Sequence, residues 1–216
     1  MILDLLFPRK CILCGRLLER EQLDLCHDCR INAPECPVHK QKLPWLDSWA
    51  AVWYYEDQVR ESILRYKFHG LRAYAPGYGR LLAMKLHREH PDGFDLITWV
   101  PVSRLRKLKR GFDQVALLAK YTGKELCMKP VPTVRKIRHN RPQSGITNEA
   151  QRHANVLGVY QLTDPAAVAG KRVLLLDDII TTGATAGEVA RLLLTAGAKE
   201  VHFGAVAAAR HSAKKK

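Results

Sequence analysis

The sequence predicts an α/β fold, with a mostly parallel central sheet, helices on both of its faces and a small cysteine-rich module in front. Strand-like apolar segments alternate with helical segments, which is the pattern of crossover connections in a parallel sheet. Five of the six cysteines lie within the first 36 residues. A chain of 216 residues can form one ordinary domain with a small appendage, so we expect a module over 1–45 and a main domain over 46–216.

Four segments of the main domain have the composition of strands. Residues 48–56 alternate and are rich in aromatic side chains. Residues 94–102 form a buried-type apolar run that Pro101 interrupts, and 170–180 form a second such run that contains two adjacent aspartates. Residues 200–208 are the fourth predicted strand, and helical segments separate all four.

Four segments between these strands have helical periodicity. In the first of them, Val59, Ile63 and Tyr66 form an apolar stripe along one face. Gly70 and Gly123 are expected to end the first and third helices, because glycine adopts the left-handed conformation at a helix C-terminus. The predicted helices cover 58–70, 78–90, 112–123 and 185–198.

The charge of the chain favours anionic partners. The formal net charge is +14, which suits phosphates, nucleotides or nucleic acid. Two cationic runs, 104–110 and 135–141, fall between strand-like segments where substrate loops usually lie, and the alternative for each is a solvated face. The long polar segment 136–156 contains glycine and proline and is predicted to be either a functional lid or a disordered loop.

The apolar segments are too short for a membrane protein. No run reaches about 18 apolar residues, so a membrane-spanning helix is not expected. The first ten residues are apolar, but they include Asp4 and lack a small-residue cleavage site, which is not the pattern of a signal peptide. We therefore expect a cytoplasmic protein.

Four cysteines form two CxxC pairs, and their spacing predicts a metal site. Two such turns complete a tetrahedral sulfur site suited to a structural zinc ion, because no coordination position stays open for a substrate. The alternatives are an iron–sulfur cluster, disulfides, which a cytosolic compartment disfavours, and a thioredoxin-like redox pair. The predicted ligands are Cys11, Cys14, Cys26 and Cys29.

Two further cysteines lie outside these pairs. Cys36 and His39 have the spacing of another half-pair of ligands and could exchange with one of the CxxC pairs, so the ligand set stays open. Cys127 is isolated, and we expect it to be a small buried apolar side chain.

Residues 173–185, VLLLDDIITTGAT, place two aspartates at the end of a buried strand and a hydroxyl-rich turn before a helix. In an open parallel sheet, ligands bind beyond the carboxyl ends of the strands. Thr185 and Glu188 match a capping box, which predicts that the helix begins near Thr185. The preceding turn would then cradle a phosphate at the helix N-terminus. The cradle residues are Thr181, Thr182, Gly183, Ala184 and Thr185.

Asp177 and Asp178 would repel that phosphate unless they face sugar hydroxyls or a divalent cation. A ribose 5-phosphate satisfies both halves of the motif, with its phosphate in the turn and its 2′ and 3′ hydroxyls on the aspartates. The alternative is that Asp178 caps the turn and Asp177 is a solvated strand end.

The thirteen residues resemble the signature of type I phosphoribosyltransferases, which bind 5-phosphoribosyl-1-pyrophosphate (PRPP). The whole chain resembles the ComF competence-protein family in its paired CxxC motifs, in KFHG (67–70), in PVSRLRKLKRGFDQ (101–114) and in RPQSGITNEAQRHAN (141–155). Members of that family often have proline where Ser103 stands, asparagine where Asp113 stands and a second cysteine where His39 stands. Because His39 replaces a cysteine, it stays open whether Cys36 and His39 bind zinc.

The resemblance implies a type I phosphoribosyltransferase fold and roles for the basic residues. Val102, Ser103 and Arg104 would form a loop facing the pyrophosphate. Arg106, Arg110 and Lys67 would be charge-assisted donors, Mg²⁺ would bridge pyrophosphate and ribose oxygens, and 136–156 would be a mobile lid. Each arginine also has a simpler interpretation as a solvated cation.

Three functions are compatible with these features. The first is an enzyme that transfers the phosphoribosyl group of PRPP to an unidentified acceptor and releases pyrophosphate. The second is a module that binds single-stranded DNA during natural transformation, together with a helicase and other cytosolic competence proteins. The third is a regulator that binds PRPP without turnover.

Overall fold

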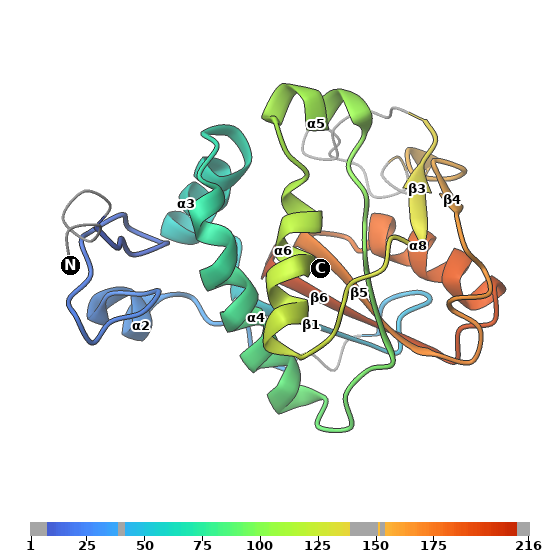
Figure 1. Ribbon diagram of the computed structural model, residues 1–216, viewed down its shortest axis with the longest axis horizontal. Coiled ribbons are helices and arrows are strands. Elements are labelled where there is room, and N and C mark those ends of the chain that lie inside the picture. The colour runs from blue at the N-terminus through green and yellow to red at the C-terminus, as the bar shows by residue number, and fades with distance from the viewer. Residues whose placement is uncertain (1–7, 39–41, 139–150, 152–153, 211–216) are drawn as a thin grey trace, which may run out of the picture.

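The computed structural model describes residues 8–38, 42–138, 151 and 154–210. Its centre is a four-stranded parallel sheet with the strand order β1-β6-β5-β2 (Figure 1). The predicted α/β fold with a parallel sheet is therefore confirmed. The strands are β1 (Ser48–Tyr54), β2 (Leu96–Trp99), β5 (Arg172–Ile180) and β6 (Glu200–Ala208).

Both faces of the sheet are covered. Leu174 and Leu176 of β5 pack into one core cluster, while Val173 and Leu175, which point the other way, pack into a second. All four side chains are fully buried, as expected for a central parallel strand. The first cluster lies under α3 (Asp57–Phe68), α4 (Ala75–Glu89) and α6 (Gln114–Glu125), and the second under α8 (Ala184–Thr195).

A second, two-stranded sheet lies on the α8 side of the main sheet. It pairs β3 (Val134–Lys136) with β4 (Tyr160–Leu162) in antiparallel register. Val134 and Tyr160 join the same core cluster as α8. In Figure 1 this pair lies towards the same end of the molecule as the short helix α5 (Arg104–Arg110).

The cysteine-rich segment packs against the outer side of α3 and α4 (Figure 1). It contains one short helix, α2 (His27–Asn32). The Ser62 hydroxyl of α3 donates to the carbonyl of Ile12, and Arg80 of α4 donates to both carboxylate oxygens of Asp24 at 2.7 and 2.6 Å. Ile12 is itself part of the core cluster under these helices. The segment and the main domain therefore share one continuous core.

Helix boundaries differ from the prediction in two places where tertiary contacts decide them. α4 begins at Ala75, directly after a 3₁₀ turn (Arg72–Tyr74), and not at residue 78. The prediction that Gly123 ends a helix is wrong, because α6 continues to Glu125. A Cβ at Gly123 would lie 2.5 Å from the carbonyl oxygen of Met128, so glycine is needed there for close packing and not for a helix end.

The helix α5 covers a cationic run that we expected to be part of a substrate loop or a solvated face. Ser103 caps it by accepting a 3.4 Å hydrogen bond from the Arg106 N–H, and Gly111 ends it in the left-handed conformation with φ 75°. A run of five cations in seven residues has weak helical periodicity. For this reason the sequence did not predict a helix here, although Ser103 and Gly111 are typical capping residues.

The predicted capping box of α8 is also wrong, although the helix begins at Ala184, close to the expected position. Gly183 precedes the helix with φ 77°, and no side chain caps it. The Glu188 carboxylate instead accepts from the Arg191 guanidinium at 3.0 and 3.1 Å and from the Gly158 N–H at 3.3 Å. The Glu188 carboxylate is therefore engaged elsewhere and does not cap α8.

Several predictions fall outside the described residues. They concern His39, residues 139–141 of the cationic run 135–141 and most of the long segment 136–156. Within the described part of the chain, no helix is long and apolar enough to cross a membrane.

Gly79→Ala tests the close approach of α4 to α6. A Cβ at Gly79 would lie 2.6 Å from the Cβ of Tyr121 and 2.8 Å from the backbone nitrogen of Thr122, so α6 would have to move. We expect a decrease of about 1–3 kcal/mol in the free energy of unfolding, measured by urea denaturation. Gly77→Ala on the same helix would meet side-chain atoms, of Asp24 at 2.9 Å and of Ile12 at 3.1 Å, in place of backbone atoms and should cost less. Equal stability of Gly79→Ala and wild type would contradict this packing.

Candidate functional site

A cavity of about 500 Å³ opens at the carboxyl ends of the strands. Its floor is the end of β5, and the turn that follows β5 forms one wall together with the first residues of α8. The other walls come from the last turn of α3, from α5 and from the β3–β4 pair. Segments that are far apart in the sequence therefore meet at the edge where a parallel sheet binds its ligands.

Most of the residues that the sequence singled out lie on this cavity. Two do not: Ser103 is buried as the cap of α5, and Arg104 lies on a separate shallow hollow with Lys107, Leu108 and Gly111. The predicted residues that line the cavity are Lys67, Val102, Arg106, Arg110, Asp177, Asp178, Thr181, Thr182, Gly183, Ala184 and Thr185.

Asp178, on the cavity floor, interacts with two other side chains. Its Oδ1 lies 2.7 Å from the Lys67 Nζ, and its Oδ2 accepts a 2.9 Å hydrogen bond from the Gln114 amide nitrogen. The carboxylate is 8% exposed and the Lys67 side chain 15%, so the pair is largely removed from water. This arrangement differs from the alternative in which Asp178 caps the following turn.

Asp177 has the opposite environment. Its Oδ1 accepts the backbone N–H of Asp178 at 2.7 Å, and no described side chain forms an ion pair with it. Burial, followed by the adjacent charge of Asp178, raises the pKa of Asp177 well above its usual range, and Lys67 and Lys136 offset this only in part. A ligand that donates hydrogen bonds or carries a cation would relieve this repulsion.

The turn from Thr181 to Thr185 brings backbone N–H groups to the cavity wall. Gly183 adopts a left-handed φ of 77°, and a Cβ there would lie 3.1 Å from Leu43. The Thr182 hydroxyl makes only a long contact of 3.4 Å with the Ala184 N–H. Since α8 runs for 12 residues behind this turn, its dipole makes the wall attractive to an anion.

Among the described residues of the cavity wall, cationic side chains outnumber carboxylates by five to two. The Arg110 guanidinium lies over the Phe68 ring at 4.9 Å, and its burial lowers the pKa of this arginine. This excess favours a ligand with several negative charges. The cations are Lys67, Arg106, Lys109, Arg110 and Lys136.

Sequence reasoning gave no individual role to several residues of the cavity, among them Gln114, Lys136 and Tyr160. Gln114 is the first residue of α6 and directly follows Asp113, which caps this helix. Its place after a helix cap is the sequence feature that could have pointed to it. Lys136 lies 3.5 Å from the Tyr160 hydroxyl, and these two side chains come from the β3–β4 pair. Burial, and after it the charge of Arg106, lowers the pKa of Lys136 to about 8. No local pattern in the sequence shows that this hairpin covers the cavity.

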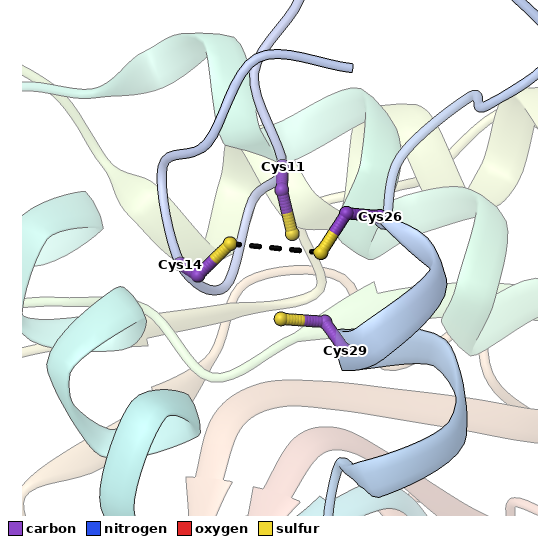
Figure 2. Close-up of side chains that lie close together, drawn as sticks. All are labelled: Cys11, Cys14, Cys26 and Cys29. Carbon is purple, nitrogen blue, oxygen red and sulfur yellow. Dashed lines mark hydrogen bonds between the residues drawn. The ribbon is translucent and has the colours of Figure 1, made fainter. Parts of the chain in front are cut away.

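A second site lies in the cysteine-rich segment, where four sulfur atoms converge (Figure 2). All four Sγ atoms lie within 4.8 Å of one another, and Cys14 Sγ is 3.7 Å from Cys26 Sγ. A tetrahedral zinc ion with Zn–S bonds of about 2.3 Å separates its sulfur ligands by about 3.8 Å. The donor set of Cys11, Cys14, Cys26 and Cys29 therefore fits a structural zinc ion.

The thiols of this cluster differ in acidity. Burial tends to raise the pKa of Cys11, but hydrogen bonds from backbone N–H groups outweigh it and lower the pKa to about 7. Burial raises the pKa of Cys14 and of Cys29. Cys29 Sγ also lies 3.2 Å from Gln58 Oε1 of α3, and this contact ties the cluster to the main domain.

The two other cysteines lie elsewhere. Cys36 is fully buried in the core cluster that contains Trp49 and Ala51, and it is not part of the four-sulfur cluster. The expectation that Cys127 is buried is wrong, because this residue is exposed and has a positive φ of 55°.

Comparison with known proteins identifies the family. A family model described as phosphoribosyl transferase domain matches residues 111–216, and one described as double zinc ribbon domain matches residues 2–41. The competence protein ComFC of Streptococcus pneumoniae (strain ATCC BAA-255 / R6) is 30% identical over an alignment that covers 89% of this chain and 96% of that protein. The chain belongs to the ComFC/YhgH family.

Two further proteins are similar to this member of the ComFC/YhgH family. The DNA utilization protein YhgH of Escherichia coli (strain K12) is 29% identical over 88% of this chain and 86% of its own length. The solved glutamine PRPP amidotransferase from B. subtilis is 25% identical with a TM-score of 0.41, over 61% of this chain and 26% of that one.

Replacement of one zinc ligand is expected to release the metal. We predict that Cys26→Ser loses the single zinc equivalent and melts at a lower temperature, because the segment packs on α3 and α4 and folds together with its metal. Zinc content by plasma mass spectrometry and a thermal melt measure this. Cys127→Ser is the matched control and should keep its zinc. A full zinc equivalent in Cys26→Ser would contradict the ligand assignment.

Proposed function

We propose that this ComFC/YhgH family member binds PRPP with Mg²⁺ in the cavity and transfers its phosphoribosyl group to an acceptor. One observation carries the proposal: two adjacent carboxylates, the N-terminus of α8 and an excess of cations share one cavity at the end of β5. The carboxylates suit hydroxyl groups, the helix N-terminus suits a phosphate, and the cations suit a pyrophosphate. PRPP contains all three groups in one molecule.

Each part of PRPP then has a place in the cavity. The 5-phosphate would lie on the turn 181–185, and the ribose hydroxyls would face Asp177 and Asp178. The pyrophosphate would lie against Val102 and the cations Arg106 and Arg110. These groups belong to α5 and its N-terminal approach, so Ser103 would act by capping the helix that presents them.

The cations of the cavity suit the departure of pyrophosphate. As the acceptor attacks C1 of the ribose, the C1–oxygen bond breaks and negative charge grows on the leaving pyrophosphate, where guanidinium groups stabilise it. Mg²⁺ would neutralise phosphate oxygens of PRPP and add Lewis-acid assistance. The protein then has to position the substrate, and no covalent intermediate with a side chain is required.

Calorimetry with PRPP and Mg²⁺ tests binding, and pyrophosphate release against a panel of nucleobases and amines tests transfer. We expect PRPP to bind and one acceptor class to release pyrophosphate. Binding without release from any acceptor would favour the alternative of a PRPP sensor. Absence of binding would contradict the proposed function.

Two arginines of α5 form a matched pair for this experiment. Arg106 lies on the cavity and Arg104 does not. We predict that Arg106→Ala raises the dissociation constant of PRPP by about 10- to 100-fold, because it removes a charge-assisted hydrogen bond to pyrophosphate. Arg104→Ala should change it less than twofold. Equal effects of the two substitutions in calorimetry would show that the pyrophosphate lies elsewhere.

A second candidate function is binding of single-stranded DNA on the outer surface of α5. Leu108 is 80% exposed and Leu105 61%, and they lie between cationic side chains. Arg104, Lys107 and Leu108 share a hollow separate from the cavity. The names of the relatives, which refer to competence and DNA utilization, suit a role in DNA uptake. We propose that this function involves cytosolic competence proteins such as a helicase, in a reducing compartment that keeps the four thiols available for zinc.

The double substitution of Arg104 and Lys107 by alanine tests this surface. We predict weaker binding of a fluorescent oligonucleotide and a shallower dependence of log affinity on log salt, by about 0.7 for each DNA phosphate that the variant no longer neutralises. PRPP binding should be unchanged in this variant. Arg106→Ala should show the reverse pattern. DNA binding that resists both substitutions, or that does not depend on salt, would exclude the α5 surface.

A further inference from the structure

We infer that Arg72 is a positioning residue for the pyrophosphate side of the cavity: it clamps the C-terminal end of α5 and thereby holds Arg106 and Arg110 in place. This inference rests on the proposed function and goes further than it. Arg72 is not among the described residues that line the cavity, so it acts on the ligand only through α5.

The helix α5 has no apolar anchor of its own in the core. None of its 7 residues is buried, and its two leucines, Leu105 and Leu108, are 61% and 80% exposed. A short helix without a buried apolar side chain has little to resist local opening or displacement. The position of α5 therefore depends on the residues that flank it and on the contact between Arg110 and Phe68.

The residues that flank α5 hold its two ends in different ways. At the N-terminal end, the buried Ser103 caps the helix. At the C-terminal end, Phe112 is only 8% exposed, and its ring meets the buried Tyr66 ring edge-on at 5.7 Å. Gly111, with a φ of 75°, joins Phe112 to the helix. Because glycine has the least restricted backbone, this junction needs a further contact to be held.

Arg72 supplies that contact. Its Nη2 donates a 2.7 Å hydrogen bond to the carbonyl oxygen of Gly111, and its Cζ lies 4.9 Å from the centre of the Phe112 ring. One guanidinium group therefore binds both residues of the junction. A cation that binds a carbonyl at the C-terminal end of a helix also complements the helix dipole.

General electrostatic attraction does not explain this arrangement. All five charged side chains of α5 are cationic, so they repel the guanidinium of Arg72. Arg72 lies close to α5 because a carbonyl oxygen and an aromatic face accept it. Its own backbone is fixed as well: its N–H donates to the carbonyl of Gly70 at 2.7 Å, and the 3₁₀ turn that it begins leads directly into α4. The clamp thus joins α5 to the frame of the main domain.

The clamp affects one side of the cavity and not the other. Arg106 and Arg110 line the cavity and belong to α5, so their guanidinium groups move with this helix. Charge-assisted bonds to phosphate oxygens depend on distance and direction, and a shift of about 1 Å is enough to weaken them. The two aspartates and the turn 181–185 belong to β5 and the start of α8, which Arg72 does not hold.

The test is calorimetry on the full-length, zinc-loaded protein with Mg²⁺, and it compares PRPP with ribose 5-phosphate, which lacks the pyrophosphate. In Arg72→Ala we expect the dissociation constant of PRPP to rise about three- to tenfold and that of ribose 5-phosphate to change less than twofold. Arg72→Lys keeps a donor and a positive charge and should restore part of the loss. Equal weakening of both ligands would overturn the inference, because Arg72 would then support the domain as a whole.

Arg88→Ala is the matched control. It removes an arginine of α4 that is 63% exposed and pairs with Glu35 at 3.0 Å, and it should change the binding of neither ligand.

A double substitution separates positioning from a charge that acts through space. If Arg72 acts by positioning Arg106, then Arg72→Ala should weaken PRPP binding less in the Arg106→Ala background than in the wild type. Full additivity of the two substitutions would overturn the inference, because a distant charge would contribute equally in both backgrounds.

Hydrogen exchange measured by mass spectrometry tests the clamp without a ligand. In Arg72→Ala the amides of residues 104–112 should exchange about fivefold faster or more, while those of the second half of α4 should not change. Unchanged exchange over 104–112 would overturn the inference even if PRPP binding were weaker. If the wild type did not bind PRPP, the proposed function would fail, and the exchange rates would still decide whether Arg72 holds α5.

Discussion

The structure is organised around one buried carboxylate, that of Asp178, and the two side chains that neutralise it. Lys67 reaches it from the last turn of α3, and Gln114 reaches it from the first residue of α6. A charge removed from water is tolerated only when it is paired and hydrogen-bonded, so this carboxylate holds the ends of two helices against the end of β5. The position of the cavity follows from this constraint, because the same three elements form its floor and one wall.

The pairing of Asp178 also determines the character of Asp177. Two adjacent carboxylates at one strand end cannot both be compensated by one lysine. Asp178 receives the ammonium and the amide, and Asp177 receives only a backbone N–H, so its pKa rises through burial and through the charge beside it. The cavity therefore contains one carboxylate that is structurally satisfied and one that needs a ligand. Under the proposed function, this asymmetry would orient a sugar phosphate with its hydroxyl face towards β5 and its phosphates towards the cations.

The zinc ribbon supports the same element that supplies Lys67. The Cys29 thiol contacts Gln58, the Ser62 hydroxyl donates to Ile12, and both contacts are made by α3. Arg80 of α4 adds an ion pair to Asp24. Because a four-sulfur zinc site holds its ribbon rigid, these contacts transmit that rigidity to the helix whose last turn lines the cavity. A metal with no open coordination position can thus contribute to the site by fixing α3, even though it lies outside the cavity.

Sequence patterns predicted the parts of the site that are local and missed the parts that only packing brings together. The buried run of β5, the two aspartates and the turn before α8 are contiguous, so strand periodicity and helix-terminus chemistry were enough to place them. The capping box failed because Arg191, three residues further on, competes for Glu188, and a competing ion pair leaves no trace in a four-residue motif. Gln114 and Asp178 are 64 residues apart and meet only because α6 packs closely on α4 and on the sheet. Whether a polar side chain is left with an unpaired atom depends on all of its neighbours at once. For this reason a contact such as that between Gln114 and Asp178 cannot be predicted from a local sequence pattern.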